Sequence, residues 1–384
     1  MRDRAPRIVL FSGGTACRST NIALSRHGAT LTRIVPAWDS GGSSRVIRET
    51  FRMLPVGDIR QALMTMAHGE GKAGDVVKIF NARLSSALGQ AEAAEEFRYF
   101  ASGDHPLLQR MEPAQAGTIL HYLDLFGSAI PADFDFGNGS IGNFILTGAY
   151  LAHDNDINAA ILEFRRLLGI NGHVWPSSIQ PDVELSARLG SGHEVFGQHV
   201  VTSLDAEEVA LGITDISLTA RNTGEVVRAN PLILGAIAHA DAIVFGPGSF
   251  YSSILPHLLV QGVVQALAAN RTARRIFVGN ILECAETRGT NLAELVSVFT
   301  ERFSRVAGEN VPALTNILVN RELFPFAKTV GRFRYLREGR IEALGRETGA
   351  EMLLSEFEDA WSRGQHDGEE VASIILSLVK QHIG

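Results

Sequence analysis

The sequence predicts an α/β fold in which helices cover both faces of a parallel β-sheet. Short apolar runs rich in β-branched residues alternate with longer amphipathic stretches at both ends of the chain. This alternation is typical of parallel sheets, because each strand is followed by a helix that crosses back over the sheet. The chain has 384 residues, 45% hydrophobic and 20% charged, which is enough to bury a core of ordinary size. We expect a single domain over residues 1–384.

Five segments are predicted to be strands of the sheet and seven to be helices. The strand candidates are continuous apolar runs, as expected where both faces of a sheet are covered. They are residues 7–11, 31–37, 241–245, 275–278 and 316–319. The helix candidates repeat apolar residues at helical spacing. They are residues 20–26, 59–67, 141–152, 157–168, 232–240, 254–268 and 292–303.

Three segments depart from this alternation. Residues 70–127 are rich in Ala, Leu and Glu and show no strand pattern, so they predict a helical insertion. Residues 174–229 contain alternating apolar residues on either side of a Gly-Ser-Gly turn, which predicts a β-rich excursion built from an antiparallel hairpin. Residues 350–384 are predicted to form C-terminal helices.

Composition narrows the range of partners and compartments. The net charge of −7 and the isoelectric point near 6.0 argue against a general nucleic-acid-binding surface. Cys17 and Cys284 have no metal-binding spacing and form no disulfide framework, which fits a reducing cytoplasm. The most apolar long window, residues 232–246, is shorter than a membrane span and contains His239 and Asp241. We therefore expect a cytoplasmic protein with no membrane partner. Its oligomeric state stays open, with a homodimer as one option.

The segment after the predicted strand 241–245 is the most informative for function. It reads Gly-Pro-Gly-Ser-Phe-Tyr-Ser-Ser and leads into a second apolar stretch. Ligands bind at the carboxyl ends of strands in open α/β sheets, and glycines with free N–H groups at a helix start suit phosphate. An ordinary turn with a helix cap would explain the same glycines. The candidate ligand-binding residues here are Gly246, Pro247, Gly248, Ser249, Tyr251 and Ser253.

Two loops near the N-terminus also follow predicted strands and are rich in glycine. The first predicted strand is followed by Ser12-Gly13-Gly14-Thr15, which lacks both the dinucleotide fingerprint G-x-G-x-x-G and the P-loop lysine. The second is followed by Asp39, with Gly41, Gly42, Ser43 and Ser44 close behind. A carboxylate at a strand end can hold a ribose hydroxyl, a base edge or Mg²⁺. The alternative for Asp39 is an Asx turn that leads into a helix cap.

Other polar residues at predicted helix starts are weaker candidates. Asp58 and Arg60 follow Leu-Pro-Val-Gly, and a simple capping role explains Asp58 equally well or better. Asn143 opens a long apolar helix and could hydrogen-bond a ligand, with Ser140 as the cap. The chain contains no Gly-x-Ser-x-Gly elbow and no His-Glu-x-x-His motif.

Taken together, these loops resemble the 2-phospho-L-lactate transferase (CofD-like) superfamily, including the YvcK-like gluconeogenesis factors that bind nucleotide sugars. The likeness runs in order from about residue 7 to residue 320. The matching segments are residues 12–15, 39–44, 54–60, 140–143, 156–161, 172–201 and 246–260, together with Asn280 and the pair Glu286-Thr287. Many collinear motifs indicate membership far better than any one of them.

The sequence also departs from the pattern that it resembles. Ala16 replaces a glycine, Arg45 replaces another, and Ser40 replaces the second aspartate of an Asp-Asp pair. Losing one carboxylate weakens a divalent-cation site, because Mg²⁺ uses one or two carboxylates together with phosphate oxygens. Asp39 alone can still serve as that ligand, and Arg45 can contact a phosphate or carboxylate in bidentate fashion.

The resemblance implies a Rossmann-like fold that binds a nucleotide or a nucleotide-diphosphate-linked small molecule. It further implies a transferase that moves a phosphorylated small acid from a nucleoside-diphosphate carrier to an acceptor hydroxyl. Such chemistry needs positioning and charge neutralisation rather than a covalent nucleophile. Asp39 would hold Mg²⁺ or activate the acceptor, and Asn143 would orient it. The expected nucleotide and phosphate contacts are Gly13, Gly14, Thr15, Gly41, Gly42, Ser43, Ser44, Asp58, Arg60, Gly246, Pro247, Gly248, Ser249, Tyr251, Ser253 and Asn280.

A second interpretation is a non-catalytic, nucleotide-sugar-binding regulator of the gluconeogenesis-factor type. The Gly-Gly-Ser-Ser and Leu-Pro-x-Gly-Asp-Ile-Arg segments favour it, as does Ser40 in place of an aspartate. A requirement for Mg²⁺ separates the two, since a transferase needs the cation and a sensor need not. A nicotinamide-dependent dehydrogenase is disfavoured because the G-x-G-x-x-G fingerprint is absent from the sequence.

Overall fold

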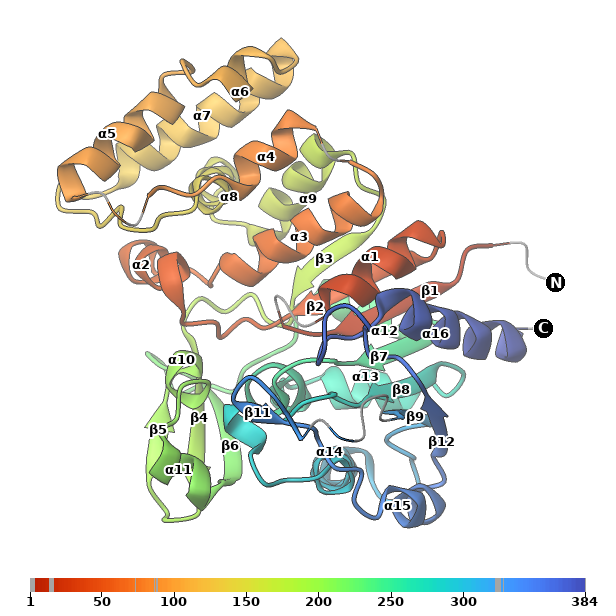
Figure 1. Cartoon of the computed structure of the whole chain (residues 1–384). Helices are drawn as coiled ribbons and strands as arrows, with labels where there is room; N and C mark the ends of the chain where they lie inside the picture. The colour runs from red at the N-terminus through yellow and green to blue at the C-terminus, as the bar shows by residue number, and fades with distance from the viewer. Residues whose placement is uncertain are drawn as a thin grey trace.

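A seven-stranded parallel sheet organises the molecule (Figure 1). The computed structural model describes residues 4–13, 17–72, 74–85, 87, 89–321, 326 and 328–383. The strands are β1 (Arg7–Phe11), β2 (Thr30–Val35), β3 (His173–Pro176), β7 (Ala242–Phe245), β8 (Arg274–Val278), β9 (Asn316–Asn320) and β12 (Glu351–Ser355). They lie in the order β12-β9-β8-β7-β1-β2-β3, and all six neighbouring pairs are parallel. The α/β fold class is thus confirmed.

The strand order reverses between β1 and β7. The chain runs from β1 outward through β2 and β3, then crosses back to β7 on the other side of β1 and continues outward to β12. In open α/β sheets this reversal leaves a crevice outside the carboxyl ends of the two central strands. Both central strands are almost wholly buried, so the crevice stands on a rigid part of the core.

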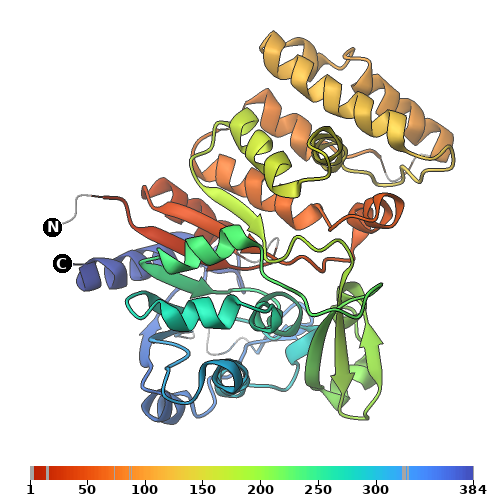
Figure 2. The same cartoon turned by 180° about the vertical axis from the view of Figure 1, so that it is seen from behind.

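Helices lie on both faces of the sheet (Figures 1 and 2). They are α1 (Arg18–Arg26), α3 (Gly57–Gly69), α9 (Ile157–Leu168), α12 (Pro231–Ala238), α13 (Val263–Ala269), α14 (Leu292–Ala307), α15 (Ile341–Thr348) and α16 (Gly368–Ile383). Helix α8 (Ile141–Ala152) lies farther from the sheet, against α3 and α9. The C-terminal α16 packs against α1, so the two ends of the chain meet on one side of the sheet. Within the described residues, every helix is too short or too polar to span a lipid bilayer.

Two further units flank the main sheet. Residues 70–127 hold α4 (Asp75–Asn81), α5 (Gln90–Ala101), α6 (Pro106–Gln109) and most of α7 (Pro113–Ala129), which packs against α8. A three-stranded antiparallel sheet contains β5 (Glu194–Phe196), β4 (Val183–Leu189) and β6 (Ile213–Ala220), in that order, with α10 (Gln198–Val201) and α11 (Ala206–Leu211). A two-stranded hairpin, β10 (Thr329–Val330) with β11 (Phe333–Arg334), follows β9.

Several predicted boundaries are wrong. Residues 351–355, expected to be helical with the rest of the C-terminus, form edge strand β12 beside β9. The β-rich excursion begins later than residue 174, because β3 belongs to the main parallel sheet. The helix predicted over 254–268 is broken into a π-helical turn η1 (Phe250–Ile254), a 3₁₀ turn η2 (Leu255–Leu259) and α13. Pro256 lacks an N–H group and Gly262 has φ +100°, and neither continues an α-helix.

Candidate functional site

The glycine loops after β1 and β7 meet at the crevice. The backbone N–H of Gly246 donates to the carbonyl of Phe11 over 3.0 Å. A Cβ atom on Gly13 would lie 2.8 Å from Oγ of Ser253 and 3.0 Å from its Cβ, so only glycine lets the β1 loop approach η1 this closely. Predicted phosphate contacts Gly13 and Gly246 are therefore brought together. The predicted contacts Gly14 and Thr15 lie outside the described residues.

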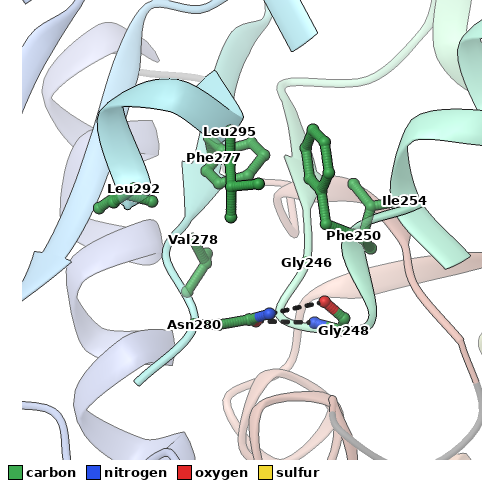
Figure 3. Close-up of a pocket in the computed structure, with 9 residues that line it drawn as sticks. All are labelled: Gly246, Gly248, Phe250, Ile254, Phe277, Val278, Asn280, Leu292 and Leu295. Carbon is green, nitrogen blue, oxygen red and sulfur yellow. Dashed lines mark hydrogen bonds between the residues drawn. The ribbon is translucent and has the colours of Figure 1, made fainter. Parts of the chain in front are cut away.

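Asn280 holds the β7 loop from the end of β8. Its side-chain amide donates to the carbonyl of Gly248 over 2.8 Å, and its Oδ1 accepts from the N–H of Gly248 over 3.1 Å (Figure 3). Behind this pair lies an apolar pocket with about 10 Å³ of free volume, lined by Phe250, Phe277 and their neighbours. That is room for one water molecule at most. The space behind the loop is therefore too small for a ligand, and the direct ligand contact expected of Asn280 stays a prediction.

Arg33 of β2 supports the β1 loop from inside the core. Its side chain is fully buried, with Nε donating to Oγ of Ser12 over 3.1 Å and a terminal nitrogen donating to the carbonyl of Gly13. Burial lowers the pKa of the guanidinium. Sequence analysis did not single this residue out. The sequence does contain an indication, because an arginine inside an apolar strand is rarely buried unless its charge makes specific hydrogen bonds.

Asp39 and Asp58 form a close pair of carboxylates at the end of β2. Asp58 lies in the first turn of α3, and a Cβ on the preceding Gly57 would lie 3.1 Å from Oδ2 of Asp39. Burial raises the pKa of Asp39. Burial, and then the charge of Asp39, raises the pKa of Asp58 to about 7, although Arg33 opposes the shift. Both residues keep partial access to solvent. Asp58 thus supplies the second carboxylate that is missing at position 40.

The loop after Asp39 is shorter than the sequence indicates. Helix α2 spans Gly42–Phe51, so Gly42, Ser43 and Ser44 lie in its first turn. The N–H of Gly41 donates to Oδ1 of Asp39 over 3.0 Å, and the Ser44 hydroxyl also hydrogen-bonds the carboxylate, which lowers its pKa against the larger effect of burial. This fits the Asx-turn alternative for Asp39 and still leaves the carboxylate at the crevice.

Arg60 and Asn143 contact each other beneath the carboxylate pair. Nε of Arg60 donates to Oδ1 of Asn143 over 2.8 Å, and its NH1 group donates to the carbonyl of Phe80 over 3.2 Å. Burial lowers the pKa of Arg60 to about 10. Ser140 caps α8 by accepting from the N–H of Asn143 over 3.4 Å. In this state both predicted ligand contacts are buried, so their direct contact with a ligand stays a prediction.

Glu286 anchors the start of η1 on the other side of the crevice. Its carboxylate accepts from the N–H groups of Tyr251 over 2.9 Å and Ser252 over 3.1 Å, and also from the Ser252 hydroxyl. Burial raises the pKa of Glu286 to about 7 despite these hydrogen bonds. The predicted contacts Tyr251 and Ser253 are buried, while Ser249 is partly exposed. Of the predicted residues in this loop, Ser249 alone is partly exposed, and the N–H of Gly248 is already bonded to Asn280.

A wider cavity of about 800 Å³ opens beside Asn280, at the carboxyl ends of β8 and β9. Polar and charged side chains line it, including Glu283, Arg334, Tyr335 and Arg337. Its volume lies within the range of small-molecule sites. Through Asn280 this cavity adjoins the β7 loop, and it is large enough for a nucleotide-sized ligand.

Comparison with known proteins identifies the family and supports the fold. The sequence profile described as 2-phospho-L-lactate transferase CofD matches residues 8–338. The gluconeogenesis factor of Listeria monocytogenes is 27% identical over 379 residues, covering 98% of this chain and 97% of that protein. The gluconeogenesis factor of Halalkalibacterium halodurans is 26% identical over 385 residues, covering 96% and 95%. A crystal structure of a Bacillus halodurans protein matches with a TM-score of 0.69 and 23% identity, covering 97% of this chain and 100% of that chain, and supports the fold.

Proposed function

This chain belongs to the 2-phospho-L-lactate transferase CofD family, and from this premise we propose that it binds a nucleoside diphosphate or a nucleotide-diphosphate-linked small molecule in the crevice between β1 and β7. The reaction that fits the site is transfer of a phosphorylated small acid from the nucleoside-diphosphate carrier to an acceptor hydroxyl. The glycine loops would hold the diphosphate through backbone N–H groups. The buried charge of Arg33 beneath Gly13 would favour an anion there.

The observation that carries this proposal is the pair Asp39 and Asp58 beside the glycine loops. Burial raises the pKa of both carboxyl groups, and the charge of Asp39 raises that of Asp58 further, so the ionised pair is costly unless a cation or a ligand offsets its charge. Phosphoryl transfer needs positioning and charge neutralisation more than a protein nucleophile. A carboxylate pair next to the glycine loops would supply positioning, and a cation that the pair holds would supply the charge neutralisation.

The same two residues fit a magnesium ion. Mg²⁺ is usually held by one or two carboxylates, and substrate phosphate oxygens and water complete its coordination. No group of three or more His, Cys, Asp or Glu side chains among the described residues could hold a metal unaided, which suits an ion shared with a phosphate ligand. When bound, Mg²⁺ would neutralise the phosphate charge, and Asp39 and Asp58 would hold it.

The test is ligand-induced stabilisation with and without Mg²⁺. A ligand that binds only the folded protein raises the unfolding midpoint, by about 2.7 kcal/mol of stability at one hundred times its Kd. We expect GDP to stabilise the wild type in the presence of Mg²⁺ and Asp39→Asn to lose that stabilisation while its unliganded fold is intact. Asp124→Asn, an exposed substitution in α7, is the matched control. A panel of nucleoside diphosphates and nucleotide sugars that shifts nothing would reject the proposal.

A nucleotide-sugar-binding regulator is the second candidate function. The observations that favour it are the names of the relatives, which are gluconeogenesis factors, and Ser40 in place of an aspartate. In the same assay, a uridine-diphosphate sugar would stabilise such a regulator equally well with and without Mg²⁺. That result, together with no transfer to an acceptor in a separate turnover assay, would support this function over the transferase.

A further inference from the structure

Ser40 and His199 make two hydrogen bonds to each other across 159 positions of sequence. Oγ of Ser40 lies 2.8 Å from Nδ1 of His199, and the backbone N–H of His199 donates to the same Oγ over 3.0 Å. The imidazole also packs on Gly197, where a Cβ would lie 3.0 Å from two ring atoms. One hydrogen bond to the ring and its packing on Gly197 therefore restrain the orientation of this exposed imidazole.

The hydrogen-bonding roles of Ser40 and Nδ1 bear on whether Nε2, the ring nitrogen remote from Ser40, carries a proton. A backbone N–H can only donate, so Ser40 Oγ accepts that bond and keeps one hydrogen and one further acceptor site. Nδ1 can therefore accept from the hydroxyl or donate to it. A ligand oxygen at Nε2 would select the state in which the hydroxyl donates to Nδ1. In a neutral imidazole the remaining proton then sits on Nε2, and in a protonated imidazole Nε2 carries a proton as well. Nε2–H is thus a donor in both of these states. It has no hydrogen-bond partner in the described part of the chain.

The position of α10 brings this donor to the proposed ligand site. Ser40 follows Asp39 directly, and the charge of His199 acts on the Asp39 carboxyl group. Helix α10 also contacts η1, which begins just after the β7 glycine loop. The small antiparallel unit, of which α10 is a part, therefore brings His199 near both Asp39 and the segment that follows the β7 glycine loop.

We propose that His199 is a phosphate-contacting residue, which donates from Nε2–H to an oxygen of the bound diphosphate, and that Ser40 is its positioning residue. This inference rests on the proposed nucleotide function. Ser40, which stands where the second aspartate is expected, then orients Nε2–H of His199 toward the phosphoryl group on which negative charge accumulates. Preorganised donors of this kind stabilise phosphoryl groups without reorientation during the reaction.

Two amide substitutions separate this role from a merely structural one. Asparagine places an acceptor near the position of Nδ1, so His199→Asn keeps a partner for Ser40 and removes the outer donor. Glutamine reaches the position of Nε2, so His199→Gln keeps a donor there and removes the partner. With GDP and Mg²⁺ as the probe in titration calorimetry, we expect affinity to fall about 10-fold to 100-fold in His199→Asn, as for loss of a hydrogen bond to a charged group. His199→Gln should stay within a few fold of the wild type.

The outcomes decide between the proposals. Equal or greater loss in His199→Gln would show that only the contact with Ser40 matters and would overturn the inference. Wild-type affinity in His199→Asn would also overturn it and leave the nucleotide function intact, whereas failure of the wild type to bind the panel of the previous section would reject both. For Ser40, we expect Ser40→Ala to weaken GDP binding and Ser40→Thr, which keeps the hydroxyl, to restore it. His193→Asn, in the exposed turn between β4 and β5, is the matched control.

Discussion

Replacing Glu286 by glutamine should make this protein more stable at neutral and alkaline pH. Glu286 is buried and accepts hydrogen bonds from both Tyr251 and Ser252, at the start of the turn that follows the β7 glycine loop. Glutamine keeps the shape and can keep these contacts, because its amide oxygen accepts from the two N–H groups and its NH₂ group donates to the Ser252 hydroxyl. The substitution therefore removes a buried charge with little loss of hydrogen bonding.

The magnitude follows from the pKa of the group. Burial raises the pKa of Glu286 from its ordinary value of 4.5 to about 7. The folded state thus binds the proton more tightly than the unfolded state, so stability is greatest below the unfolded pKa and is lost as pH rises through the folded pKa. The full difference corresponds to about 3 kcal/mol at about 1.4 kcal/mol per pH unit. Most of this loss falls between about pH 5 and about pH 8.

Urea unfolding at these two pH values measures the effect. We expect the stability gained by Glu286→Gln over the wild type to be about 2 to 3 kcal/mol larger at about pH 8 than at about pH 5. Glu301→Gln, on the exposed side of α14, is the matched control and should change stability by less than about 0.5 kcal/mol at either pH. A pH-independent difference between Glu286→Gln and the wild type would refute the argument, because it would mean that Glu286 is equally charged in the folded and unfolded states.

Two glycine substitutions test close backbone approaches. A Cβ on Gly148 in α8 would lie 1.9 Å from the carbonyl oxygen of Tyr122 in α7, so Gly148→Ala should force these helices apart and cost about 3 kcal/mol in chemical denaturation. Gly117→Ala, an open position in α7, should be neutral or stabilising by up to about 1 kcal/mol, and an equal loss there would contradict the packing argument. Gly13→Ala should cost about 1 kcal/mol through its clash with Ser253 and should also weaken GDP binding in the presence of Mg²⁺. Unchanged affinity in that variant would remove the β1 loop from the ligand site.

Much of the central sheet can be predicted from local sequence. Strands β1, β7, β8 and β9 are continuous apolar runs, and this pattern is strong because both faces of the sheet are covered. Edge strands lack that signal. Residues 351–355 are only partly buried, and β3 is four residues long and contains Trp175 and Pro176, so neither has a strand pattern that stands out. Their place in the sheet depends on pairing with β9 and β2, which lie far away in the sequence.

The residues of the candidate site also fall into two groups, those that local sequence predicts and those that depend on tertiary contacts. By itself the sequence determined which loops follow strands and are rich in glycine, and it identified Asp39 as a carboxylate at a strand end, because these are properties of neighbouring residues. Only the tertiary structure decided that Asp58 pairs with Asp39, that Arg33 supports Gly13 from beneath, and that Ser40 holds His199. Each of these contacts joins residues from elements that are separate in the chain, and the charges of Asp39 and Asp58 interact strongly only once burial has removed most of the water between them.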